Sequence, residues 1–221
     1  MWKTLRIMYY FMMEVISLES AGVGKAAIRA AGVLRSAGVI LYPTDTLYGL
    51  GADAFSDAAV DTIYTIKGRE PQKPTHCIVA DLAMAEEYAE VNDAARKLAE
   101  KFMPGALTLI LKKKKGVAGG IARNIDTIGI RIPNNQFCLE LARSFGRPFT
   151  TTSANREGVM PASSSGEIIM QLGENASLID LVIDGGWLPE SQASTIVNLV
   201  SGHPSILREG AIPSADILAF K

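Results

Sequence analysis

The sequence is poor in the residues that build metal sites and disulfide frameworks. Its 221 residues include two histidines and two cysteines. His76 and His203 are too few and too isolated for a recognisable metal site, so no metal held by protein ligands is predicted. Cys77 and Cys138 lie in apolar surroundings without CxxC spacing, which predicts buried free thiols in a cytoplasmic protein.

A long apolar run and a strong net charge are also missing. The apolar stretch from Ile7 to Met13 ends at Glu14, far short of the roughly 20 residues of a membrane span, and no small-residue cleavage site follows it. We therefore expect neither a signal peptide nor a membrane anchor. The net charge of −1 excludes a general electrostatic attraction to nucleic acid or to membranes.

Positive charge is nevertheless concentrated in one segment. Residues 96–147 hold eleven of the 22 basic residues and only three acids, and Lys112 to Lys115 are four consecutive lysines. One interpretation is a solvated loop beside a strand, and the other is a basic rim for a polyanion. The run lacks the neighbouring aromatic residues on which readers of single-stranded RNA stack bases, and both interpretations stay open.

Apolar periodicity predicts an alternating α/β chain that forms one domain with a substantial core, in line with an apolar content of 48%. Strands outnumber helices toward the C-terminus, which favours a single twisted sheet of mixed parallel and antiparallel strands flanked by helices. Helices are expected at about 23–35, from Ser56 to near Gly68, and at 92–103, 134–146 and 163–172; strands are expected at 38–42, 77–80, 107–111, 127–132, 178–183, 195–200 and 206–208.

Gly49 and Gly51 belong to a string that matches a loose dinucleotide fingerprint, Gly-Leu-Gly-Ala-Asp-Ala. The first glycine comes seven residues after the predicted strand, whereas the true fingerprint makes the strand-to-helix turn directly. We therefore expect a structural role for these glycines, in tight turns or in the close approach of a ligand.

Two short motifs carry the chemistry. Lys67-Gly68-Arg69 places two cations beside a glycine, and Thr152-Ser-Ala-Asn155 offers two hydroxyls and a carboxamide. Together they predict a pocket whose ligand is anionic at one end and forms hydrogen bonds at the other. A nucleoside triphosphate beside an amino acid would fit this description. Taken singly, the cations could cap a helix C-terminus, and Ser153 to Asn155 could form an ordinary turn.

Six segments follow one another along the chain: Tyr42-Pro-Thr-Asp-Thr-Leu-Tyr-Gly-Leu-Gly51, Lys67-Gly-Arg69, Pro104-Gly-Ala-Leu-Thr-Leu109, Thr152-Ser-Ala-Asn155, Ser194-Thr-Ile-Val197 and Arg208-Glu-Gly210. In these segments and their order the sequence closely resembles the YrdC-like family of threonylcarbamoyl-AMP synthases. The resemblance covers about residues 21–212 and implies a YrdC-like fold with a concave basic cleft, in which residues 1–20 form an N-terminal extension and 21–221 the domain.

The resemblance implies a nucleotidyltransferase reaction. L-threonine and bicarbonate form a carbamate, which attacks the α-phosphate of ATP, releases pyrophosphate and yields threonylcarbamoyl-AMP for the t6A modification of tRNA. The expected partners are therefore ATP with its associated Mg²⁺, L-threonine, bicarbonate and the t6A transfer machinery, with tRNA or double-stranded RNA as a further candidate. No acidic metal cage is evident, so the Mg²⁺ would be held largely by the phosphates.

The resemblance also assigns roles to single residues, and the chemistry of the side chains agrees with them. Fixed cations stabilise the negative charge that develops on the pyrophosphate leaving group. The implied phosphate contacts are Lys67, Arg69 and Arg208; threonine and its carbamate would meet Thr44, Arg131, Ser153 and Ser194; Asn155 and Thr195 would contact the nucleotide.

The sequence departs from the family pattern at two positions. Glu70 follows Arg69 where a proline is common, and Ile78 stands where many longer members carry a histidine. His76 lies two residues before Ile78 and would share its face of a strand, but no role is assigned to it. Two other functions stay open: a YciO-like relative with weak or altered activity, and an RNA-binding factor that uses the basic segment.

Overall fold

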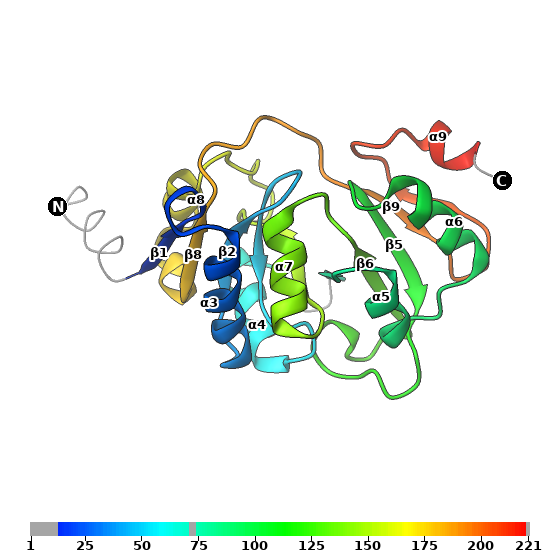
Figure 1. Ribbon diagram of the computed structural model, residues 1–221, viewed down its shortest axis with the longest axis horizontal. Coiled ribbons are helices and arrows are strands. Elements are labelled where there is room, and N and C mark those ends of the chain that lie inside the picture. Colours follow the sequence, from blue (N-terminus) through cyan, green and yellow to red (C-terminus); the bar gives the residue numbers. More distant parts are fainter. Residues whose placement is uncertain (1–12, 71–73, 220–221) are drawn as a thin grey trace.

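The computed structural model describes residues 13–70 and 74–219 (Figure 1). Its helices are α2 (Leu18–Ala21), α3 (Val23–Arg35), α4 (Asp57–Lys67), α5 (Leu82–Tyr88), α6 (Asp93–Phe102), α7 (Gln136–Phe145), α8 (Ser165–Leu172) and α9 (Ser214–Leu218), with the 3₁₀ helices η1 (Gly120–Ala122) and η2 (Gly173–Leu178). Its strands are β1 (Glu14–Ser17), β2 (Ile40–Pro43), β3 (Tyr48–Gly51), β4 (His76–Ile78), β5 (Leu107–Lys112), β6 (Thr127–Arg131), β7 (Phe149–Ser153), β8 (Leu181–Asp184), β9 (Thr195–Asn198) and β10 (Ser205–Arg208).

The strands of the described residues form one sheet in the order β1-β8-β2-β3-β7-β4-β6-β5-β9-β10. Four neighbouring pairs are parallel, among them β2 with β8 and β4 with β6. Five are antiparallel, among them β3 with β7 and β5 with β6. The prediction of a mixed sheet flanked by helices is confirmed.

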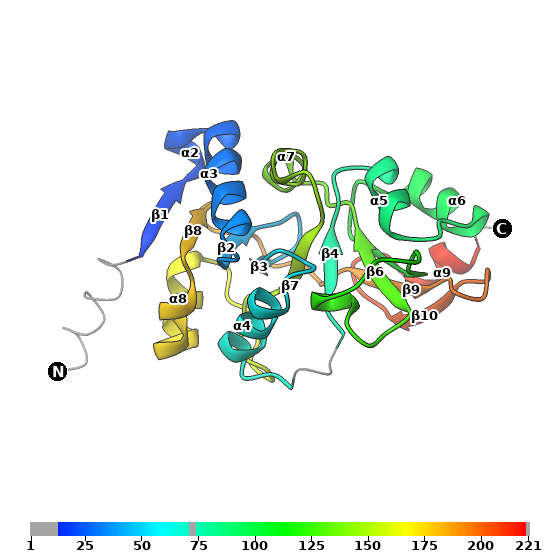
Figure 2. The ribbon, with the colours of Figure 1, turned by 90° about the horizontal axis from the view of Figure 1, so that it is seen from below.

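Helices cover both faces of this sheet (Figure 2): α3, α7, α5 and α6 lie on one side, and α4 and α8 on the other. The interior strand β2, third in the sheet, shows why both faces need a cover. Ile40 and Tyr42 pack toward α3 and α7, whereas Leu41 between them packs toward α4 and α8. Successive strand side chains point to opposite faces, so each apolar residue is buried on its own side and contributes about 1.5–3 kcal/mol.

Gly49 and Gly51 lie within strand β3 and form no turn, so that part of the expectation was wrong. Strand β2 runs antiparallel beside them, with Tyr42 opposite Gly49. A Cβ atom at Gly49 would stand 3.0 Å from Cζ of Tyr42, and one at Gly51 would stand 2.8 Å from its Cε1. The glycines leave room for the tyrosine ring, which is buried.

Besides the 3₁₀ helices η1 and η2, six elements were not predicted: β1, α2, β3, α5, β7 and α9. The strand β1 pairs in parallel with β8, so part of the segment expected to be an extension belongs to the sheet; residues 1–12 of that segment lie outside the described residues. The strand β7 carries three threonines and a serine, and its sequence gives little apolar alternation to detect. None of the helices in the described part of the chain is long and apolar enough to span a membrane.

Candidate active site

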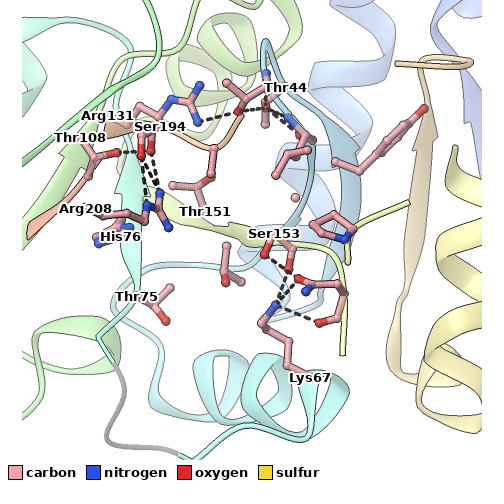
Figure 3. Close-up of a pocket in the computed structure, with 18 of the residues that line it drawn as sticks. Thr44, Lys67, Thr75, His76, Thr108, Arg131, Thr151, Ser153, Ser194 and Arg208 are labelled. Atoms are coloured by element: carbon pink, nitrogen blue, oxygen red, sulfur yellow. Dashed lines mark hydrogen bonds between the residues drawn. The ribbon is translucent and has the colours of Figure 1, made fainter. Parts of the chain in front are cut away.

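A cavity of about 380 Å³ opens near the middle of the sheet. Its described lining comes from β3 and the loop before it, the end of α4, strands β4, β5, β6, β7 and β10, and the segments that follow α4 and β7 and precede β9. In the close-up of Figure 3, Lys67 lies at one end, and Thr44 and Arg131 lie at the other. Eight of the nine residues predicted for the site line this cavity: Thr44, Lys67, Arg69, Arg131, Ser153, Asn155, Ser194 and Arg208.

Lys67 joins the two motifs that the sequence keeps 86 residues apart. It is the last residue of α4, which ends because Gly68 adopts the left-handed conformation with φ +59°. The side-chain amine is buried and donates to the carbonyl oxygen of Ser153. It also donates to the carbonyl oxygen and Oδ1 of Asn155, at 3.0 and 3.1 Å. The helix end and the end of β7 therefore form one unit.

The surroundings of Lys67 weaken its hold on its proton. Burial, and secondly the nearby Arg69, lower its pKa to about 8, while Glu157 acts in the opposite direction. At neutral pH the amine is still mostly charged, but its charge is poorly solvated. A bound anion would supply the stabilisation that water does not.

The hydroxyl of Ser153 is fixed by the same unit. It donates to Oδ1 of Asn155 at 2.5 Å, and the Asn155 amide donates to the carbonyl of Val159, also at 2.5 Å. Strand pairing holds Ser153 opposite Gly49. Because Lys67 and Ser153 donate to the same amide oxygen, the orientation of the Asn155 carboxamide is determined on both sides.

Arg131 anchors the other end of the cavity and already has a partner for each of its nitrogens. Its Nη2 donates to Oδ1 of Asp45 at 2.6 Å and its Nη1 to Oγ1 of Thr46 at 3.0 Å. Its Nε donates to the carbonyl of Gly105 at 3.2 Å. The ion pair is nearly closed to solvent, with 5% of the Arg131 side chain and 12% of the Asp45 side chain exposed.

Thr44 lines the cavity, yet its hydroxyl mainly holds the loop between β2 and β3. It donates to the carbonyl of Leu47 at 2.7 Å and accepts the amides of Thr46 and Leu47 at 3.0 and 3.1 Å. This is the turn-forming role that hydroxyl residues often play after a strand. The loop in turn holds Asp45 and Thr46 against Arg131.

Arg208 reaches the cavity from the edge strand β10. Its Nη2 donates to the carbonyl oxygen of Ser194 at 2.7 Å and to the Ser194 hydroxyl at 3.3 Å. That hydroxyl lies 2.9 Å from the hydroxyl of Thr108. Burial, and secondly Arg131, lower the pKa of Arg208, which stays charged because an arginine pKa starts so high.

Thr195 is the one predicted site residue that does not line the described cavity. Consecutive strand residues point to opposite faces, so Ser194 faces the cavity and Thr195 faces away. Its hydroxyl donates to the carbonyl of Ile212 at 2.6 Å and accepts the amides of Gly210 and Ile212 at 3.0 and 3.1 Å. The residue holds the segment that follows Arg208 against the sheet, which corrects its expected contact with the nucleotide.

Several lining residues were not predicted, among them His76, Thr108, Thr151 and Glu157. His76 was noticed only because it shares a strand face with Ile78. Ile78 is fully buried in the core beneath α3 and α7, so it is His76 that reaches the cavity. The alternation of side chains along a strand was the one sequence signal for His76. It predicts the face of the sheet on which a side chain lies, but not whether a cavity opens at that position.

The charge of the cavity favours an anion. Its described lining contains four cationic side chains, those of Lys67, Arg69, Arg131 and Arg208, against one carboxylate, that of Glu157. No group of three or more histidine, cysteine, aspartate or glutamate residues that could hold a metal ion occurs in the described part of the chain.

Comparison with known proteins identifies the family of this chain. The model of the Sua5/YciO/YrdC family, whose description reads "Telomere recombination", matches residues 32–210. The chain belongs to the Sua5/YciO/YrdC family. A curated relative from Methanocaldococcus jannaschii, named "Putative threonylcarbamoyl-AMP synthase", is 42% identical over 175 residues, which are 79% of this chain and 81% of that protein.

Solved structures of this family share the fold. The crystal structure of P. abyssi Sua5 complexed with L-threonine matches with a TM-score of 0.82 and 31% identity, over 94% of this chain and 61% of that one. This chain therefore spans about three fifths of that Sua5. The crystal structure of E. coli YciO matches with a TM-score of 0.80 and 28% identity, over 93% of this chain and 98% of that one. The resemblance to this family and the expected fold are confirmed.

Proposed function

We propose that the protein is an L-threonylcarbamoyladenylate synthase, which forms threonylcarbamoyl-AMP and pyrophosphate from L-threonine, bicarbonate and ATP. The observation that carries this proposal is the convergence of Lys67 and Arg69 with Arg208, from two distant segments, on one cavity. Membership of a family with a relative of that name supports it. The product would pass to the machinery that makes t6A in tRNA, in the cytoplasm.

In this reaction the protein acts through charge and position. Attack of the carbamate oxygen on the α-phosphate breaks the bond to the β-phosphate oxygen, and the pyrophosphate carries away the negative charge. Lys67, Arg69 and Arg208 would meet that charge, and a fixed cation in a poorly solvated site stabilises charge far more strongly than one in water. Mg²⁺ would come with the phosphates of ATP as part of the substrate.

Arg131 would receive the threonine carboxylate. A guanidinium carries five N–H donors, and three nitrogens of Arg131 each use one on Asp45, Thr46 and Gly105. One N–H on Nη1 and one on Nη2 are left for a substrate. Asp45 fixes the plane of the guanidinium, and Thr44 keeps the loop that carries Asp45 in place.

A YciO-like activity is the second candidate, because YciO matches almost over its whole length. In that case the cavity would bind a nucleotide but turn it over weakly or in another reaction. The binding of tRNA or double-stranded RNA by the basic segment is compatible with either candidate, since Lys112, Lys114 and Lys115 are exposed.

The decisive experiment incubates the purified protein with ATP, Mg²⁺, bicarbonate and L-threonine. Pyrophosphate release is followed, and the mixed adenylate is sought by mass spectrometry. Release that requires both threonine and bicarbonate supports the synthase. ATP binding without such release favours the YciO-like activity, and no ATP binding overturns both.

A further inference from the structure

His76 is a cavity residue to which the proposed function assigns no role. It begins β4, which lies between β6 and β7, and its backbone neighbours are Gly129 on one side and Thr151 on the other. It lines the cavity and is partly exposed there. No hydrogen bond of its imidazole nitrogens to another described residue is found, so the nitrogens remain available to a ligand.

The neighbouring strand makes room for the imidazole ring. A Cβ atom at Gly129 would stand 2.3 Å from Cδ2 of His76 and 3.0 Å from its Cγ, closer than any real contact allows. The ring therefore lies against the backbone of β6, where only glycine fits. This fixes the ring at the cavity wall rather than leaving it free to turn into solvent.

The charges that face this ring are cationic. Arg131 comes from β6, Arg208 from β10, and Arg69 from the segment after α4; Thr151 of β7 is uncharged. Burial, then Arg208, Arg69 and Arg131 in that order, lower the pKa of His76 to about 4. The imidazole is therefore neutral at physiological pH and has a nitrogen lone pair to offer.

We propose that His76 is the proton acceptor of this site, neutral in the empty cavity and protonated once a nucleoside triphosphate offsets the arginines around it. The inference rests on the proposed function. Threonine ammonium and bicarbonate give the carbamate, one water and one proton: the nitrogen loses two protons, one of which leaves with the bicarbonate hydroxyl as water. The other proton needs a base. The negative charge of the bound phosphates, which react in the next step, allows His76 to take up that proton.

The other ionisable groups of the cavity are less suited to that task. The amine of Lys67 is still mostly protonated at neutral pH and donates to three oxygens, so it has no lone pair for a further proton. The carboxylate of Glu157 belongs to an exposed residue at the Lys67 end. The arginines do not release protons in proteins. His76 is the neutral base that lies among the cations.

A histidine-selective NMR titration tests the first half of the proposal. The chain has two histidines, and His203 is exposed, so it serves as an internal control. The full-length protein is titrated alone, with ATP and with inorganic pyrophosphate. We expect the pKa of His76 to rise by about one unit or more with either anion, and the His203 signals to be unaffected when the anion is added.

Kinetics of matched variants test the second half. His76→Gln keeps a polar side chain but cannot take up a proton, and His203→Gln is the control. At neutral pH we expect pyrophosphate release to fall on the order of 10²-fold in His76→Gln, with ATP affinity within a few-fold of wild type. The loss should shrink as the pH rises, because the threonine amine then deprotonates unaided, and a merely structural defect would not recover in this way.

Each outcome decides the proposal. A shifted His76 pKa with a pH-dependent loss in His76→Gln supports it. Turnover by the wild type with an unmoved His76 pKa, or with full activity of His76→Gln, overturns this inference and leaves the proposed function intact. If neither ATP nor pyrophosphate binds, the proposed function and this inference both fall.

Discussion

Two cations at opposite ends of the cavity are equally buried and yet serve differently. Lys67 is 4% exposed and Arg131 is 5% exposed. The hydrogen bonds of Lys67 go to neutral carbonyl and amide oxygens, which do not cancel its charge. Arg131 is paired with the carboxylate of Asp45, which cancels most of its charge.

The difference shows how one cavity can attract a polyanion at one end and orient a small substrate at the other. A net charge without a carboxylate partner favours a ligand that brings its own negative charge. A closed ion pair offers little net attraction, but it holds two N–H donors in a rigid plane. We therefore expect the Lys67 end to act by attracting a negatively charged ligand and the Arg131 end by orienting a substrate. Four predictions test this comparison.

The largest effect is expected from removing the charge at the Lys67 end. Lys67→Met keeps much of the side-chain volume and should lower kcat/KM for pyrophosphate release by about 10³-fold, because the leaving group loses a fixed cation. Lys97→Met, on an exposed position of α6, is the matched control and should leave turnover unchanged. Thermal unfolding verifies that both variants fold. A Lys67→Met enzyme within a few-fold of wild type would contradict the assignment.

The next effect is expected from unbalancing the Arg131 end. Asp45→Asn leaves a buried guanidinium without its counter-charge, which should lower the free energy of unfolding by about 3 kcal/mol. The KM for threonine should rise about 10-fold because the guanidinium plane is no longer fixed, while ATP affinity changes little. Asp126→Asn removes an exposed carboxylate as a control. An equal loss of affinity for threonine and for ATP would mean that the two ends of the cavity do not act independently.

A smaller effect should separate the two ends by pH. The pKa of Lys67 lies near 8 in the folded protein, so its charge, and with it ATP affinity, should fall as the pH rises through 8. Calorimetry from pH 7 to 9.5 should show a several-fold weakening in the wild type and none in Lys67→Met. Between pH 8 and the ordinary value of 10.5 the unfolded chain binds more protons, so Lys67 makes the free energy of unfolding rise with pH in that window.

The smallest effect on turnover is expected from the lysine run. Thr108 of β5 lines the cavity, whereas Lys112 ends the same strand, about 13 Å further along. Lys114→Gln with Lys115→Gln should change synthase turnover less than about twofold. The same double variant measures the alternative function: if RNA binds there, its affinity in wild type falls steeply with salt, and the slope decreases in the variant.

Some of the fold was predictable from local signals. The helix α4 begins at Ser56, whose hydroxyl accepts the amide of Ala59, and it ends at Gly68, as capping preferences predict. The apolar runs of β2 and β5 were also sufficient to predict these two strands. The strands β3 and β7 were not predicted. Two of the four residues of β3 are glycines, which are depleted in strands, and the threonines of β7 favour a strand but give no apolar alternation to detect.

The site, too, was predictable in part. The sequence by itself determined the residue types and their order: the two cations around Gly68, the hydroxyl and carboxamide of Ser153 and Asn155, and the arginines at 131 and 208. Only the tertiary structure decided which of these residues contact one another. It turned Thr195 away from the cavity, gave Arg131 its carboxylate partner and brought His76 among three arginines, because these contacts join strands that pair across long stretches of chain. Side-chain spacing along one strand fixes a face, and only the packing of strands against each other fixes what that face contains.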